Sequence, residues 1–108
     1  MIRTNIQAGI CGFHTTVTAR SADLQHVELA IESTCEKIRG LAADIAMVDA
    51  FQEIGDGFEG TILKAVRAHL KGCCSGCIVA SGIFKTMQVA GGVALPASAS
   101  VTIEKQEE

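Results

Sequence analysis

Three cysteines stand close together in the segment Cys73-Cys74-Ser75-Gly76-Cys77, and two more, Cys11 and Cys35, lie far upstream. Thiolates are ligands of zinc and of iron–sulfur clusters, and they are also the attacking groups of thiol–disulfide exchange. The Cys74-Ser75-Gly76-Cys77 spacing lets two sulfurs bind one metal centre. Both uses require the cysteines to meet in space, so the fold decides whether this chemistry is possible.

Length and composition predict a single domain over residues 1–108, because the chain is short and 48% of it is hydrophobic. The net charge of −3 without a basic stripe argues against a nucleic-acid partner. We expect no membrane span, because no apolar run reaches the required length, and no signal peptide. These features predict a cytoplasmic protein, where thiols stay reduced. The odd number of cysteines, 5, then favours metal binding or catalysis over structural disulfides.

Hydrophobic periodicity predicts seven elements. Alternation favours strands over 2–10, 14–20 and 97–104. A spacing of three and four residues favours helices over 23–38, 44–54, 58–70 and 76–90, with Ser75 as the cap of the last. The order ββααααβ predicts a two-layer α+β fold, in which a three-stranded sheet carries about four helices on one face.

The expected directions of these elements bring the cysteines together. Cys11 follows the first strand, and the first helix climbs about 18 Å to Cys35, nearly the length of the second strand, about 20 Å. If successive elements alternate in direction, the segment after the third helix, Cys73 to Cys77, returns to the same end. The prediction is that all cysteines lie at one end, with sulfurs within about 4 Å if they share a zinc ion.

We therefore predict a metal centre, zinc or an iron–sulfur cluster, held by Cys11, Cys35, Cys74 and Cys77. Cys73 and His14 are the alternative ligands. Neighbouring side chains point in different directions, so Cys73 and Cys74 are not expected to share a role. At a helix start, free N–H groups are expected to favour a thiolate at Cys77.

Two other functions fit the same residues. Cys74 and Cys77 fit a thiol–disulfide redox pair, and buried structural cysteines fit a protein-interaction module, since cysteine is often a small core residue. No catalytic residues stand out in the sequence, so whether the chain is an enzyme stays open and an accessory role is favoured. A homo-oligomer or a protein partner is compatible with the pattern.

The segment Lys85–Pro96, together with the preceding Cys-x-x-Cys and the early Cys11-Gly12-Phe13, resembles a family of small prokaryotic domains of unknown function. The resemblance covers most of the chain. It implies a compact cytoplasmic domain with a recurring cysteine set. It brings no established activity and does not choose between zinc, a cluster and free thiols.

Overall fold

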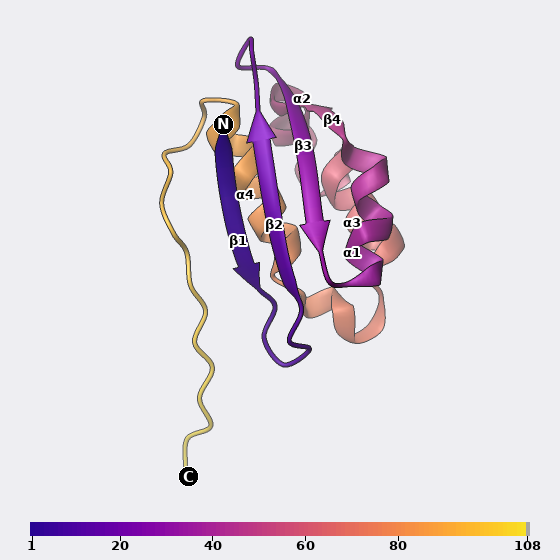
Figure 1. Ribbon diagram of the computed structural model, residues 1–108, viewed down its shortest axis with the longest axis vertical. Helices are drawn as coiled ribbons and strands as arrows, with labels where there is room; N and C mark the ends of the chain where they lie inside the picture. The colour runs from indigo at the N-terminus through magenta and orange to yellow at the C-terminus, as the bar shows by residue number, and fades with distance from the viewer. Residues whose placement is uncertain (108) are drawn as a thin grey trace.

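The structure is a computed structural model that describes residues 1–107, with a single layer of helices covering one face of a sheet (Figure 1). The sheet has four antiparallel strands in the order β1-β2-β3-β4. The strands are β1 (Ile2–Gln7), β2 (His14–Arg20), β3 (His26–Ser33) and β4 (Met47–Asp49). The α+β class is confirmed, whereas the predicted count of three strands is wrong.

Four α-helices and three short 3-10 helices complete the fold. The α-helices are α1 (Glu36–Ala42), α2 (Ala50–Asp56), α3 (Thr61–His69) and α4 (Val79–Ala90). The 3-10 helices are η1 (Ala43–Ile45), η2 (Gly57–Glu59) and η3 (Gly72–Gly76).

The predicted first helix over 23–38 is wrong, because most of that segment forms β3. Val27 and Leu29 are buried while Glu28 points outward, which is the period of a strand. Ser21 or Asp23 was expected to cap this helix. Asp23 instead accepts backbone hydrogen bonds from Gln25 and His26 at 2.9 and 2.8 Å and so closes the turn between β2 and β3.

The predicted helix over 44–54 is also divided, because β4 occupies its middle. Asp49 caps α2 by accepting a hydrogen bond from the backbone N–H of Gln52 at 3.1 Å, five residues after the predicted start. As a result α2 turns a different face inward. Glu53 is buried, whereas Phe51 and Ile54, expected in the core, are exposed.

The predicted last strand over 97–104 is not part of the sheet. Beyond α4 the chain is extended and unpaired in the described residues, and it runs away from the domain (Figure 1). The sheet therefore gains β3 and β4 and loses the C-terminal strand.

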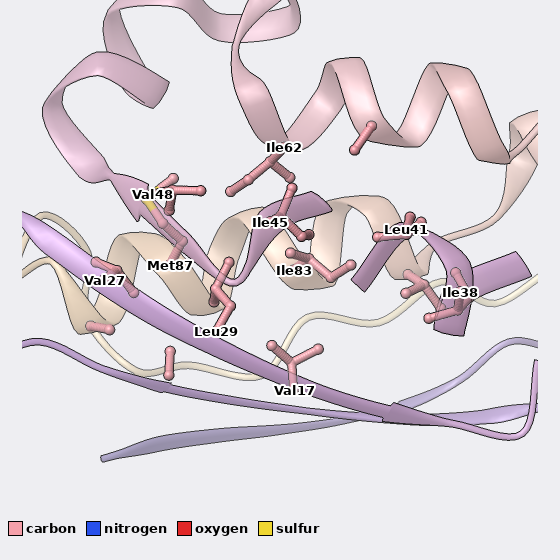
Figure 2. Close-up of a cluster of buried hydrophobic side chains, with 14 of the residues drawn as sticks. Val17, Val27, Leu29, Ile38, Leu41, Ile45, Val48, Ile62, Ile83 and Met87 are labelled. Atoms are coloured by element: carbon pink, nitrogen blue, oxygen red, sulfur yellow. The ribbon is translucent and has the colours of Figure 1, made fainter. Parts of the chain in front are cut away.

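The core lies between the sheet and the helices, as Figure 2 shows. It is aliphatic, as the composition predicts, and it takes residues from strands, helices and η1. The labelled members are Val17, Val27, Leu29, Ile38, Leu41, Ile45, Val48, Ile62, Ile83 and Met87. Helix α4 packs against β1 and β2, and α1 packs against β3.

The stretch Gly72–Ala90 is 19 residues long and, with a mean hydropathy of 1.3, apolar enough to cross a membrane by length and composition. The expectation that no apolar run reaches this length is therefore wrong. In the structure the stretch is divided into η3 and α4, and α4 buries Val79, Ile83 and Met87 in the core. This packing is consistent with a soluble protein.

Two glycines are expected to respond to substitution in opposite ways. A Cβ at Gly82 would collide with the Ile6 side chain, because α4 approaches β1 closely there, whereas Gly55 in α2 has open space. Gly82→Val should lower the free energy of unfolding by about 1–3 kcal/mol through overpacking. Gly55→Ala should raise it by about 0.5–1 kcal/mol through helix propensity. Urea unfolding of both variants checks the signs, and a stabilising Gly82→Val would contradict the close approach.

Candidate functional site

The segments that carry the cysteines lie at the same end of the fold (Figure 1). They are the β1–β2 loop with Cys11, the junction of β3 and α1 with Cys35, and η3 with its C-terminal cap, Cys73 to Cys77. We call this region the cysteine end. These segments reach one end as expected, although the strand β3, rather than a helix, returns the chain to Cys35. The expected clustering of the sulfurs is not found in the described residues, where the cysteines do not lie near one another.

Hydrogen bonds fix Cys35 beside the start of β2. Its backbone N–H donates to Ser33 Oγ at 3.0 Å, and Ser33 Oγ is 2.8 Å from Oγ1 of the buried Thr15. The backbone N–H of Thr34 donates to the carbonyl of His14 at 3.1 Å. His14, the alternative ligand, is thus an exposed residue at the cysteine end.

Cys74 lies within η3, whereas Cys77 is its C-terminal cap and has an extended backbone. The backbone N–H of Cys77 donates to the carbonyl of Cys74 at 3.1 Å. The predicted Ser75 cap is wrong: α4 begins only at Val79, and Ile78 at its N-cap makes no side-chain hydrogen bond. The chain turns at η3, before α4 begins, because Gly72 adopts a positive φ of 64°.

The five cysteines differ in burial. Cys35, Cys74 and Cys77 are partly buried and pack against the hydrophobic core, whereas Cys11 and Cys73 are exposed. All of them are free thiols. The ammonium group of Lys37, on α1, donates to Cys74 Sγ at 3.3 Å. This lysine links the first turn of α1 to η3, and no sequence pattern pointed to it.

Burial raises the pKa of the Cys77 thiol, and the neighbouring Cys11, Cys35 and Cys74 raise it further. The backbone N–H of Val79 acts in the opposite direction by donating to the sulfur, but burial dominates. The predicted thiolate at Cys77 is therefore disfavoured.

The thiols do not form a closed ligand set. Within residues 1–107, no group of three or more His, Cys, Asp or Glu side chains is arranged to hold a metal ion. The fold thus gathers the segments at one end but leaves the side chains apart. The donor set still has the chemistry that zinc and iron–sulfur clusters require.

Comparison with known proteins places the chain in a family. A family model described as a family of unknown function (DUF6951) matches residues 2–103. The chain belongs to this family. The resemblance to a small domain of unknown function is confirmed. No curated protein matches the chain, and no solved structure does.

The other two histidines lie in separate ion pairs that the sequence did not predict. His69 Nε2 is 2.7 Å from Asp44 Oδ2. At the opposite end from the cysteines, His26 Nδ1 is 2.7 Å from Asp23 Oδ2 and its Nε2 is 3.9 Å from Asp49 Oδ2. Both pairs are solvent-exposed and tie neighbouring segments together.

The His26 pair predicts a pH dependence of stability. Its hydrogen bond to Asp23 raises the pKa of His26 above 6.5, and the pKa of Asp23 is held well below its usual range by the same bond. At a pH below the ordinary histidine pKa of 6.5, protonated His26 therefore stabilises the folded state. This contribution is lost as the pH rises through the raised pKa of His26 in the folded state. His26→Gln should lower the urea midpoint at about pH 5.5 and leave it nearly unchanged at about pH 9. Equal effects at both pH values would contradict the ion pair.

Proposed function

We propose that this protein binds a metal centre, zinc or an iron–sulfur cluster, through Cys11, Cys35, Cys74 and Cys77, as a cytoplasmic accessory domain. The observation that carries the proposal is the meeting of three chain segments, far apart in sequence, at the cysteine end (Figure 1). Each of these segments brings at least one thiol.

The electrostatics of the cysteine end support a cation. Burial and, to a lesser extent, the charges of the other cysteines raise the pKa of the Cys77 thiol, and a bound cation offsets both because it stabilises thiolates. Metal binding then releases protons. Lys37, whose ammonium group lies 3.3 Å from Cys74 Sγ, partly neutralises the negative charge that four thiolates bring.

Closing the site requires the thiols to come closer together than they lie in the described structure. Cys35, Cys74 and Cys77 pack against the core, so they form the fixed part. Cys11 is exposed on the β1–β2 loop, between Gly9 and Gly12, which both have positive φ. A hairpin loop of this kind can change its conformation more readily than a packed helix start.

Metal analysis of protein purified without oxygen tests the proposal. Zinc near one equivalent without visible absorption would identify a zinc site. Iron with broad visible absorption and acid-labile sulfide would identify a cluster. Protein that is free of metal and does not bind added zinc or reconstituted cluster would contradict the proposal.

Adjacent cysteines are expected to differ in this assay. Cys73→Ala should leave bound metal nearly unchanged, because Cys73 is exposed and is not among the groups that affect Cys77. Cys74→Ala should abolish tight binding, because it removes a proposed ligand that packs against the core and is contacted by the Lys37 ammonium group at 3.3 Å. Metal content of the two purified variants is the measurement. Equal losses would mean that the wrong member of the pair is assigned.

A thiol–disulfide redox function is the second candidate, favoured by the contact between Lys37 and Cys74. A lysine ammonium beside a sulfur stabilises negative charge on an attacking thiol. Because the pKa of Cys77 is raised, Cys77 would be the second thiol of the redox pair rather than the attacking one. Thiol titration before and after mild oxidation separates the cases: loss of two thiols in metal-free protein, prevented by Cys74→Ala, supports exchange. If the protein binds no metal and the number of free thiols does not change on oxidation, the cysteines have a structural role.

A further inference from the structure

The C-terminal segment has the pattern of a strand but no partner within the described residues. Apolar positions alternate with polar ones from Ala97 to Glu104. Leu95, Val101 and Ile103 are 88%, 68% and 90% exposed. The family match extends to residue 103, so this segment belongs to the domain rather than to an unrelated tail. Exposed alternating residues of this kind are stabilised when they add to a sheet edge.

Strand β1 offers such an edge. It pairs with β2 on one side, and in residues 1–107 no strand pairs with its other side. Ile6 is buried toward the helices, whereas Arg3 and Asn5 lie on the open face of the sheet. The outer backbone groups of β1 are free to form a further ladder. The opposite edge, β4, is only 3 residues long and is a poorer template.

We propose that residues 100–104 of one copy pair antiparallel with β1 of a second copy, and that the exchange is reciprocal in a dimer. The register that places Glu104 opposite Arg3 also places Ile103 opposite Thr4 and Val101 opposite Ile6. Directly opposed residues share one face of an antiparallel ladder. Apolar residues of the added strand thus face the helices, and its polar residues join the open face.

The direction of the chain argues for a second copy. Helix α4 ends near the N-terminal end of β1, and the C-terminal segment descends from there in the same direction as β1 (Figure 1). If the C-terminal segment paired with β1 of its own chain, the two would run parallel. Glu104 would then lie at the end of β1 that is away from Arg3. The segment also extends past the β1–β2 loop (Figure 1), where it can reach another molecule.

Oligomeric state is the first test. By light scattering and sedimentation equilibrium at micromolar concentration, the full chain should be a dimer and a chain ending at Val93 a monomer. Val101→Pro, which removes a ladder position, should weaken dimerisation at least tenfold, whereas Ala94→Pro, outside the paired segment, should not. A monomeric full chain, or a dimeric truncated chain, would overturn the proposal.

A charge swap tests the register and distinguishes exchange from pairing within one chain. Arg3→Glu and Glu104→Arg should each weaken the homodimer, because like charges then face each other. An equimolar mixture of the two variants should restore dimers, since each chain supplies the partner that the other needs. Failure of the mixture to recover dimers would overturn the register. Circular dichroism of each variant is the check that it is folded.

Discussion

Glu53→Ala is expected to lower the free energy of unfolding by about 3 kcal/mol, because it leaves backbone N–H groups in the interior without an acceptor. The Glu53 carboxylate is 2% exposed and accepts hydrogen bonds from the backbone N–H groups of Thr61 and Ile62 at 2.9 and 2.6 Å. These are first-turn N–H groups of α3, which have no partner inside the helix. Glu53, in the first turn of α2, thus joins α2 to the start of α3.

Two further variants make this prediction specific. Glu53→Gln keeps one oxygen acceptor and should cost roughly half as much. Glu59→Ala is the matched control, because its carboxylate is 81% exposed and pairs only with Arg67, at 3.4 Å, among the described residues; its effect should stay within about 0.5 kcal/mol. Urea unfolding measures all three. Equal effects of Glu53→Ala and Glu59→Ala would show that Glu53 does not cap α3.

The sequence predicted the late helices well because their signals agree. In α3 and α4 the apolar spacing, the flanking glycines and the length all indicate a helix. From Leu24 to Ile38 the signals conflict: Val27 and Ile31 fit a helical stripe, yet Val27, Leu29 and Ile31 also alternate as in a strand. Pairing with β2 and β4 decides between the two, and such long-range pairing is invisible in a local pattern.

One overlooked signal would have improved the prediction. Asp49 and Gln52 have the spacing of a helix-capping pair, which places the start of α2 after Asp49 and separates β4 from it. The inward face of α2 was harder to predict. Hydrophobic periodicity does not indicate a buried glutamate, because the burial of Glu53 depends on the hydrogen bonds that it accepts from N–H groups of α3.

The candidate site was predictable at the level of segments. Either a helix or a strand after β2 returns the chain to the same end, so the error over β3 did not move Cys35. The finer geometry depends on η3, where the chain turns before α4 instead of starting it. For this reason the sequence predicted a thiolate at Cys77, whereas burial raises the pKa of that thiol.

Metal removal is expected to have the largest effect on thermal stability if the proposed centre forms. A bound ion would join the β1–β2 loop, the start of α1 and η3, so its binding free energy would be partly folding free energy. Metal at about a thousand times its dissociation constant stabilises a fold by about 4 kcal/mol. In a domain of this size that corresponds to a rise in Tm of about 15 °C.

The expected result is that a chelator lowers the Tm of the metal-bound protein by about this amount. Cys77→Ser should lower the Tm similarly and abolish the further effect of the chelator, because it removes one of the four proposed ligands. Cys73→Ala is the matched control: this exposed neighbour should keep both the high Tm and its sensitivity to the chelator. Scanning calorimetry with and without chelator measures each form. A wild-type Tm that does not respond to metal or chelator would rule out a structural metal centre and favour free thiols.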